Sequence, residues 1–195
     1  GGRLNSESFE VDGQAGADWA AGIVAQLREM DNVQLMTRTT VAGVYDQGTF
    51  GALERVNHHT SVRDGKAPLE TFWRIVAKQS ILAAGAIERP IAFQNNDRPG
   101  IMLAGAVRAY MNRFAVATGK KVSVYTNNDD GWQTAKDLRS KGVKVVAVID
   151  SRSMSPVMGI QGAEIFMGTD VVDTKGRRAL KSIKLSNGKS IDTDS

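Results

Sequence analysis

The fold is decided by residues 121–150, which read KVSVYTNNDDGWQTAKDLRSKGVKVVAVID. The runs 121–125 and 144–149 each predict a short buried strand, and residues 131–141 between them predict a helix. A strand, a helix and a second strand within about 30 residues have the size of a right-handed parallel crossover. This stretch therefore predicts a parallel sheet that is covered by a helix.

The turn inside this crossover, TNNDDG at residues 126–131, differs from a dinucleotide-binding turn. Such a turn carries glycines that let the backbone approach a pyrophosphate, and here only Gly131 remains. Asp129 and Asp130 bring negative charge to the helix end where a phosphate would bind, so we expect no phosphate there and expect one of the two to cap the helix. Asp150 follows Gly131 by 19 residues, the spacing of a ribose-binding carboxylate, but without the glycines this spacing carries little weight.

The residues before the crossover predict a helix followed by antiparallel strands. Apolar residues at three-and-four spacing predict a helix over residues 17–30. A polar segment at residues 57–67 separates extended runs, so a hairpin or a three-stranded antiparallel excursion fits. The extended runs are 33–36, 39–45, 50–56 and 69–76.

Residues 80–85, SILAAG, predict a buried strand that ends in a glycine turn. The dense turn residues NNDRPG at 95–100 predict a boundary between a first lobe, residues 1–100, and a second lobe, residues 101–195. A helix is expected over residues 104–114.

Two further strands, residues 163–172 and 179–185, are joined by a turn at residues 174–176. They either extend the crossover sheet with antiparallel members or form a small meander. The predicted fold class is α/β, a Rossmann-like FAD/NAD(P)-binding fold with a truncated first lobe.

The composition excludes several classes of protein. The 195 residues include no cysteine, which rules out disulfides, thiolate metal sites and cysteine nucleophiles and agrees with a reducing, cytoplasmic compartment. The only histidines are His58 and His59, too few for a histidine metal cage or a hydrolytic triad. We expect this pair to lie in an exposed loop, and we expect no metal site.

The charge is a small excess, +4 from 25 basic and 21 acidic residues. The densest basic stretch, residues 175–184, lacks the interleaved aromatic residues of a single-strand binder. No window reaches the roughly 18 apolar residues of a membrane span, and no secretory signal begins the chain. We therefore expect neither a nucleic acid nor a membrane as partner.

The chain begins with GGRL at residues 1–4 instead of methionine, and no strand precedes this segment. We expect an excised fragment whose exposed strand edges lead to partial disorder near Gly1 or to self-association.

Motifs along nearly the whole chain resemble a known group of enzymes. AAGAIERP at residues 83–90, followed by RPGIM at 98–102, is similar to the strand exit of two-dinucleotide-domain flavoproteins of the disulfide-reductase superfamily. Within that superfamily the chain resembles the alpha subunits of heterotetrameric sarcosine oxidases. The segments that carry this resemblance are GGRL (1–4), GADW (16–19), TRTT (37–40), AGAIERP (84–90) and VYTNNDDG (124–131).

The resemblance implies a complex that oxidatively demethylates sarcosine to glycine, reduces oxygen to peroxide and passes the one-carbon unit to tetrahydrofolate. It implies NAD in the alpha subunit, FAD in a beta subunit and FMN near the subunit boundary, with smaller subunits as further partners. The alternatives are the alpha component of a dye-linked amino-acid dehydrogenase or cyanide-forming synthase, and a non-catalytic interaction module.

The resemblance also implies cofactor-binding residues but no catalytic residue in this chain. Gly2, Arg3 and Leu4 would run near the pyrophosphate, where Arg3 either contacts a phosphate or belongs to a frayed terminus. Thr40 and Val41 would offer backbone groups to the adenine. The site would be closed by Ala84 and Gly85.

Large apolar side chains are expected to pack in the core or at its rim and not to bind a ring or a partner subunit. They are Trp19, Trp73, Trp132, Met154, Met158 and Met167.

Overall fold

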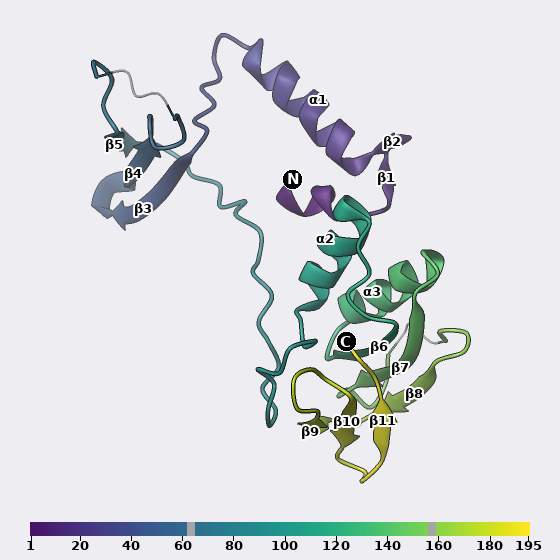
Figure 1. Ribbon diagram of the computed structural model, residues 1–195. Helices are drawn as coiled ribbons and strands as arrows, with labels where there is room; N and C mark the ends of the chain where they lie inside the picture. The colour runs from purple at the N-terminus through teal and green to yellow at the C-terminus, as the bar shows by residue number, and fades with distance from the viewer. Residues whose placement is uncertain (62–64, 156–158) are drawn as a thin grey trace. The chain divides into compact units, whose positions relative to one another are not determined.

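The computed structural model describes residues 1–61, 65–155 and 159–195 (Figure 1). Some predictions concern residues outside these ranges. They are Arg63 and Asp64 of the predicted polar segment and Met158 of the predicted packing residues. Two compact units make up the chain: one contains Gly1–Ala21 together with Ile87–Ser195, and the other contains Gly22–Ala86. The division at residue 100 into two dinucleotide-binding lobes stays a prediction.

The parallel crossover is confirmed. Strands β6 and β7 are parallel, with Val122 opposite Val145 and Tyr125 opposite Ile149, and α3 connects them. A third strand, β8, adds to β7 in parallel, so the sheet order is β6-β7-β8. The bounds are β6 Lys121–Thr126, α3 Asp129–Ser140, β7 Lys144–Asp150 and β8 Glu164–Met167.

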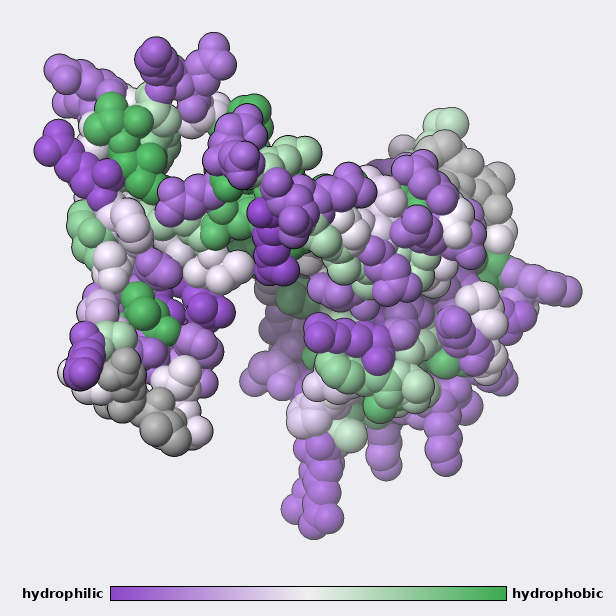
Figure 2. All heavy atoms as spheres, turned by 90° about the horizontal axis from the view of Figure 1, so that it is seen from above, coloured by the Kyte–Doolittle hydropathy of each residue, from purple (hydrophilic) through white to green (hydrophobic). Residues whose placement is uncertain are grey.

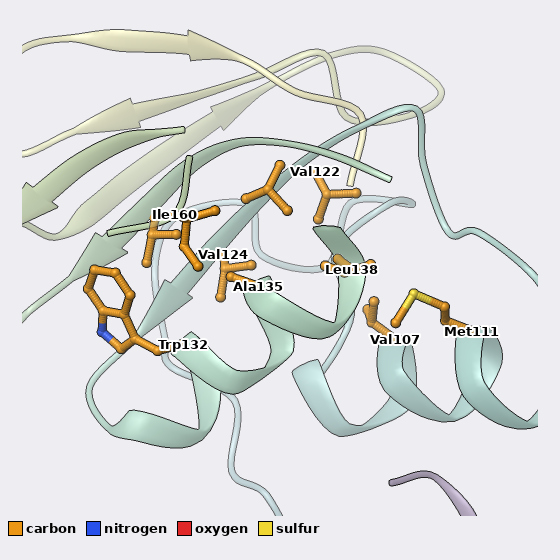
Figure 3. Close-up of a cluster of buried hydrophobic side chains, with 10 residues drawn as sticks. Val107, Met111, Val122, Val124, Trp132, Ala135, Leu138 and Ile160 are labelled. Atoms are coloured by element: carbon orange, nitrogen blue, oxygen red, sulfur yellow. The ribbon is translucent and has the colours of Figure 1, made fainter. Parts of the chain in front are cut away.

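One face of this sheet packs against two helices, α3 and α2 (Ala104–Phe114) (Figure 3). Val122 and Val124 of β6 and Val145 and Val148 of β7 suit a pleated surface and pack in this layer. Trp132 and Leu138 of α3 are fully buried there. The cluster comprises Val107, Met111, Val122, Val124, Trp132, Ala135, Leu138, Val145, Val148 and Ile160.

The other face packs against an antiparallel meander, β9-β10-β11. A meander does form, but the predicted strand over residues 163–172 divides into β8, which joins the crossover sheet in parallel, and β9, which belongs to the meander. The bounds of that predicted strand and the antiparallel extension of the crossover sheet are therefore wrong. Strand β7 ends at Asp150 and β8 begins at Glu164, and a connection of about a dozen residues is what a parallel pair requires. The bounds are β9 Val171–Lys175, β10 Ser182–Leu185 and β11 Ser190–Asp192.

The unit Gly22–Ala86 contains the predicted three-stranded antiparallel excursion, β3-β4-β5. Residues 33–36, predicted as extended, form no strand. The turn between β3 and β4 is a short 3-10 helix, η2 (Asp46–Gly48), in which Gly48 has a φ of 69°. The strand bounds are β3 Thr39–Tyr45, β4 Thr49–Arg55 and β5 Glu70–Val76.

This antiparallel sheet leaves much of its apolar surface uncovered. Val44 is 71% exposed and Phe72 is 63% exposed, and the part of the molecule that holds the sheet shows hydrophobic residues at its surface (Figure 2). Of the three strands, only Gly51 and Ala52 of β4 are buried. The sheet therefore forms without burying a core of its own.

The prediction of a buried strand over residues 80–85 is wrong. Ile81 and Leu82 are 94% and 92% exposed, and the segment is extended chain without a strand assignment. Apolar residues form a buried strand only where a neighbouring strand accepts their backbone hydrogen bonds. None of the strands in the described ranges pairs with this segment.

The N-terminal segment forms secondary structure from Gly2 onward, while the expected disorder near Gly1 or self-association stays a prediction. It consists of η1 (Gly2–Asn5), the short pair β1 (Glu10–Val11) and β2 (Gln14–Ala15), and the predicted helix, which forms as α1 (Gly16–Arg28). The amide of Asn112 in α2 donates to the Ser6 carbonyl, 2.8 Å, and so fixes this segment to α2.

Candidate functional site

A cavity of about 540 Å³ lies beside β6, within the unit that contains Ile87–Ser195. This volume is in the range of small-molecule sites. Strand β6 and the turn after it form one wall, and the chain from Ile87 to Ala104 forms the other. Val107 and Leu138 of the helices and Ile183 of the meander add apolar surface.

Glu88 fixes the second wall to the start of α2. Its carboxylate accepts hydrogen bonds from the backbone amides of Ala104, 3.0 Å, and Gly105, 2.7 Å. The first amides of a helix have no partner within the helix, and a carboxylate suits the positive end of the helix dipole. Glu88 of the ERP motif at residues 88–90 thus has a structural role, which is to cap the start of α2.

The turn NNDRPG at residues 95–100 ties this wall to β9. Arg98 donates from Nε to the Thr174 hydroxyl, 3.1 Å, and from Nη1 to the Gly176 carbonyl. Asn95 donates to the Asp173 carboxylate, 2.8 Å, and this hydrogen bond holds the pKa of Asp173 below its ordinary value. The turn therefore anchors the cavity wall to the meander.

The turn after β6 is capped by Asn128, so the expectation that Asp129 or Asp130 caps α3 is wrong. The Asn128 side chain accepts from the amides of Asp130, 3.0 Å, and Gly131, 3.4 Å. Asn128 has an extended backbone, as a capping residue requires, and this places both aspartates inside the first turn. There they still stabilise the positive helix end.

Gly131 has a packing role in the same turn. A Cβ atom at Gly131 would lie 2.3 Å from the Cβ of Thr126, closer than any real contact. Glycine at this position lets the start of α3 pack closely against the end of β6. The last glycine of a dinucleotide-binding turn serves the same purpose.

Asp150 ends β7 with its carboxylate already engaged. Trp132 Nε1 donates to one oxygen, 2.7 Å, and the side chain and the backbone amide of Arg152 supply further hydrogen bonds of 2.8 to 3.3 Å. Burial opposes the charge of Asp150, but the hydrogen bonds from Arg152 and Trp132 outweigh it and lower its pKa. The carboxylate is fully buried and is not free to bind a ribose hydroxyl.

Arg152 also pairs with Asp129, 2.9 Å, across the turn after β6. Hydrogen bonds to Asp150 and Asp129 raise the pKa of its guanidinium further. The two positions where a dinucleotide would place its pyrophosphate and its ribose are therefore joined by an ion pair within the chain. The residues of this crossover do not fit NAD.

Arg3 and Arg108 form a second ionic cluster with three carboxylates. Arg108 in α2 is 3% exposed, donates to Asp137, 2.9 Å, and to Asp130, 3.2 Å, and pairs with Glu7. Arg3 pairs with Glu7 and Asp130, and the hydrogen bond to Glu7 is the main cause of its raised pKa. Arg3 therefore binds carboxylates of its own chain.

The other predicted cofactor-binding residues are distributed over both compact units. Gly2 and Leu4 lie with Arg3 in η1. Thr40 and Val41 lie in β3, opposite Leu53 and Ala52 of β4. The remaining pair, Ala84 and Gly85, lies in exposed extended chain, where Gly85 has a φ of 72°. The assignment of these seven residues to one nucleotide site stays a prediction.

Sequence reasoning missed Glu7, Arg108 and Arg152. Arg108 lies on the same helical face as Val107 and Met111, at a position that the apolar pattern of residues 104–114 already marks as buried. A charged residue there was a signal for a buried ion pair. Arg152 follows the parallel strand by two residues, and nothing in its local sequence identifies its partners.

The histidine pair and the large apolar residues agree with their predicted burial to different degrees. His58 and His59 lie exposed outside any strand, as predicted. Trp132 is in the core and Met167 packs against it, while Trp73 is 37% exposed and donates to Glu54, 2.7 Å. Trp19 is partly buried.

Met154 contradicts the expectation of core packing, because its side chain is 82% exposed. It lies after Asp150, where the chain has left the sheet.

In the described ranges, no group of three or more histidine or acidic residues could hold a metal ion. A search of the same ranges found no helix with the length and apolar character needed to cross a bilayer.

Three curated proteins resemble this chain over most of its length, and all are named sarcosine oxidase subunit alpha. The protein from Rhizobium meliloti (strain 1021) is 45% identical over 188 residues, which is 96% of this chain. The protein from Corynebacterium sp. (strain P-1) is 40% identical over 185 residues, 92% of this chain. The matched stretch is homologous to part of the sarcosine oxidase alpha subunit.

The resemblance predicted from the sequence motifs is thereby confirmed. The chain spans only 19% of the length of each of these relatives. No protein-family model matches the chain.

Solved structures confirm the fold class. L-proline dehydrogenase from P. horikoshii has a TM-score of 0.66 at 21% identity, and the match covers 100% of this chain and 34% of that one. A NAD-dependent persulfide reductase from A. fulgidus has a TM-score of 0.59 at 17% identity, covering 95% of this chain and 34% of that one. The fold is that of flavin- and nicotinamide-dependent oxidoreductases.

Proposed function

We propose that this chain is part of the alpha subunit of a sarcosine oxidase complex. The complex oxidatively demethylates sarcosine to glycine, forms peroxide and transfers the one-carbon unit to tetrahydrofolate. The observation that carries the proposal is the 45% identity over 188 residues to the alpha subunit of Rhizobium meliloti. A cytoplasmic location belongs to the same proposal and rests on the lack of cysteine.

The role of the chain within this complex is nucleotide binding and subunit assembly. In this proposal the alpha subunit holds NAD, the beta subunit holds FAD, and FMN lies near the boundary between the subunits. Gly2, Arg3 and Leu4 run near the NAD pyrophosphate, where Arg3 contacts a phosphate only if it leaves Glu7 and Asp130. Thr40 and Val41 contact the adenine, and Ala84 and Gly85 close the site. Because the crossover at residues 121–150 does not fit NAD, the nucleotide is assigned to these other segments.

The activity is tested with the natural-length subunit, co-expressed with the beta subunit and the smaller subunits of the proposed complex. We expect sarcosine-dependent formation of peroxide and of glycine, and release of NAD from the denatured complex. Replacement of sarcosine by L-proline at the same concentration is the control. Peroxide formation from L-proline but not from sarcosine would contradict the assignment of the substrate.

Nucleotide binding is tested separately by titrating NAD into this chain in a calorimeter. We expect NAD to bind the natural-length subunit in a parallel titration and not the chain alone. We expect no gain on Asp129→Gly/Asp130→Gly, because Asp150 and Arg152 remain paired. Binding by the chain that changes with these substitutions would place the nucleotide on the crossover instead.

The alpha component of a dye-linked dehydrogenase is the second candidate. The structural similarity to L-proline dehydrogenase, which covers the whole of this chain, favours it. In that case the natural complex would reduce an artificial dye with an amino acid as donor and would form no peroxide in air.

A non-catalytic interaction module is the third candidate. The occupied carboxylates of Asp129 and Asp150 favour it for the crossover, since no ligand group is free at the usual dinucleotide site. It predicts an unchanged turnover of the assembled complex on Arg152→Gln, together with weaker assembly.

A further inference from the structure

Positive charge is concentrated in one segment of the meander. Residues 174–191 contain six basic residues and no acidic one. The whole chain carries a net charge of only +4, so the residues outside this segment include more acidic than basic groups. The segment runs from the end of β9 through β10 to the start of β11 (Figure 1). The positive charge of the chain therefore belongs to one part of one sheet and is not spread over the surface.

Two of the six cations have an acidic neighbour. Lys189 pairs with Glu164, and Lys184 lies opposite Asp173 in the ladder between β9 and β10. The other four, which we call the basic hairpin, are Lys175, Arg177, Arg178 and Lys181. All four are exposed, and within residues 1–61, 65–155 and 159–195 none of their side chains forms an ion pair.

The basic hairpin brings its four residues together at one end of the meander. The amide of Lys181 donates to the Lys175 carbonyl, 2.8 Å, so these two residues face each other where the strands end. Arg177 and Arg178 lie in the turn between them. Asp192 lies on β11, which β10 separates from β9. Four positive charges are therefore gathered at one turn with no carboxylate among them.

The turn at residues 95–100 holds the basic hairpin in place. The Arg98 guanidinium donates to the Gly176 carbonyl, and the amide of Leu180 donates to the Pro99 carbonyl, 2.8 Å. Leu180 is buried and packs in the core cluster on the meander side of the parallel sheet. Gly176 has a φ of 146°, a conformation that favours glycine. Because the turn is already ordered, a partner would lose little free energy in ordering it.

The charge and the shape of the basic hairpin favour an acidic protein surface as its partner. Like charges that are held together repel one another, and an acidic surface placed over them turns this repulsion into attraction. A nucleic acid fits less well. Residues 171–192 contain no aromatic side chain that could stack on a base, and the four cations occupy one turn instead of a groove.

We propose that the basic hairpin is a docking site for an acidic surface of another subunit of the same complex. This rests on the proposed function in one respect, that the natural protein is assembled with other subunits. The four cations attract the acidic subunit and orient it before the contact forms. Exposed charges of this kind raise the association rate and make it sensitive to salt, and they affect the dissociation rate less.

The test measures association of the natural-length subunit with the separately purified other subunits, by surface plasmon resonance at low and at high salt. The variant replaces the whole basic hairpin by glutamine: Lys175→Gln, Arg177→Gln, Arg178→Gln and Lys181→Gln. At low salt it should associate about tenfold more slowly than the parent, with a dissociation rate changed by less than about threefold. At high salt, where charges are screened, the two association rates should be similar.

A matched control removes four other exposed cations that form no ion pair in the described ranges. Its substitutions are Lys136→Gln, Arg139→Gln, Lys141→Gln and Lys144→Gln. The net charge changes by the same amount, so this control should associate like the parent if the position of the charges matters. Equal slowing by both variants would show a general effect of net charge and would overturn the proposal.

Further outcomes also decide the proposal. It is overturned if the parent does not associate with the other subunits, or if the hairpin variant associates as fast as the parent at low salt. It is overturned in favour of a nucleic acid if the hairpin variant assembles normally but loses binding to a DNA duplex that the parent binds.

A smaller variant keeps the test decisive if the fourfold one does not fold, as judged by its thermal midpoint. Arg177→Gln/Arg178→Gln changes only the exposed turn and should still slow association by about threefold, compared with Lys136→Gln/Lys141→Gln. Association is measured without sarcosine or NAD. A complex that assembles through the basic hairpin but does not oxidise sarcosine would therefore contradict the proposed function alone.

Discussion

The parallel sheet β6-β7-β8 and the antiparallel sheet β3-β4-β5 differ in burial, although both are built from apolar, β-branched runs. In the parallel sheet, Ala147, Val148 and Ile149 of β7 follow one another and are all 0% exposed. In the antiparallel sheet, Val44 of β3 and Phe72 of β5 are 71% and 63% exposed. The difference shows that burial depends on the layers that cover a sheet: helices and a meander cover both faces of the parallel one, and no such core forms on the antiparallel one.

The difference in burial between the two sheets is tested most directly by one tryptophan substitution in each sheet. Trp132→Ala should lower the free energy of unfolding by about 4 kcal/mol, because it leaves a cavity in a closed core and removes a hydrogen bond from buried Asp150. Trp73→Ala in the antiparallel sheet should cost about 1 kcal/mol. Urea unfolding followed by circular dichroism measures both. Equal losses would mean that the two sheets are equally well covered.

The ionic cluster of the parallel unit gives the next largest effect. Arg108→Met should cost about 3 kcal/mol, since it leaves the buried carboxylate of Asp137 without its cation and leaves Glu7 paired with Arg3 alone. Lys189→Met is the control, because Lys189 and its partner Glu164 are about half exposed, and it should change stability by less than about 0.5 kcal/mol. Chemical denaturation of both variants measures these losses. A loss for Arg108→Met as small as that for Lys189→Met would mean that the cluster does not stabilise the N-terminal segment.

Two glycine substitutions test how closely the layers of the parallel unit pack, because they should change stability in opposite directions. Gly131→Ala should cost about 2 kcal/mol because its methyl group would overlap Thr126. Gly22→Ala, in α1 with open space around it, should stabilise the chain by about 0.7 kcal/mol through helix propensity. The two thermal midpoints should therefore move in opposite directions. A shift of both in the same direction would contradict the close contact between α3 and β6.

The smallest expected effect is the pH dependence that Asp150 contributes. Its pKa is lowered in the folded chain, so the charged form stabilises folding above the unfolded pKa of about 3.9, and this contribution is lost as the pH falls through the folded value. Asp150→Asn should be less stable than the parent near neutral pH, and the gap should narrow below about pH 4. Urea midpoints measured across that range test this. A gap that stays constant would assign the loss to packing and not to charge.

Much of the fold could be predicted from the sequence because its signals are local. The short buried runs at residues 121–125 and 144–149, with a helix between them, predicted the parallel crossover. The antiparallel excursion also followed from strand runs and turn residues. The prediction of a buried strand over residues 80–85 failed, because an apolar run forms a buried strand only if another strand lies beside it.

The candidate site was less predictable. The loss of glycines at residues 126–131 predicts a poor phosphate site, and this stays a prediction, while the capping residue is Asn128 and not an aspartate. The role of Glu88 in capping α2, 16 residues away, was not visible from its motif. These contacts join residues that are distant in sequence, and local patterns carry no information about such pairs.

The sequence by itself determined the fold class, the order of helices and strands in the crossover, and the homology to the sarcosine oxidase alpha subunit. It could do so because periodicity and motif identity are properties of neighbouring residues. Only the tertiary structure decided that Asp150 and Asp129 share Arg152 and that Arg108 lies among three carboxylates. A charge or a backbone group is satisfied by whatever the fold brings within hydrogen-bonding distance, and that is settled only when the layers pack.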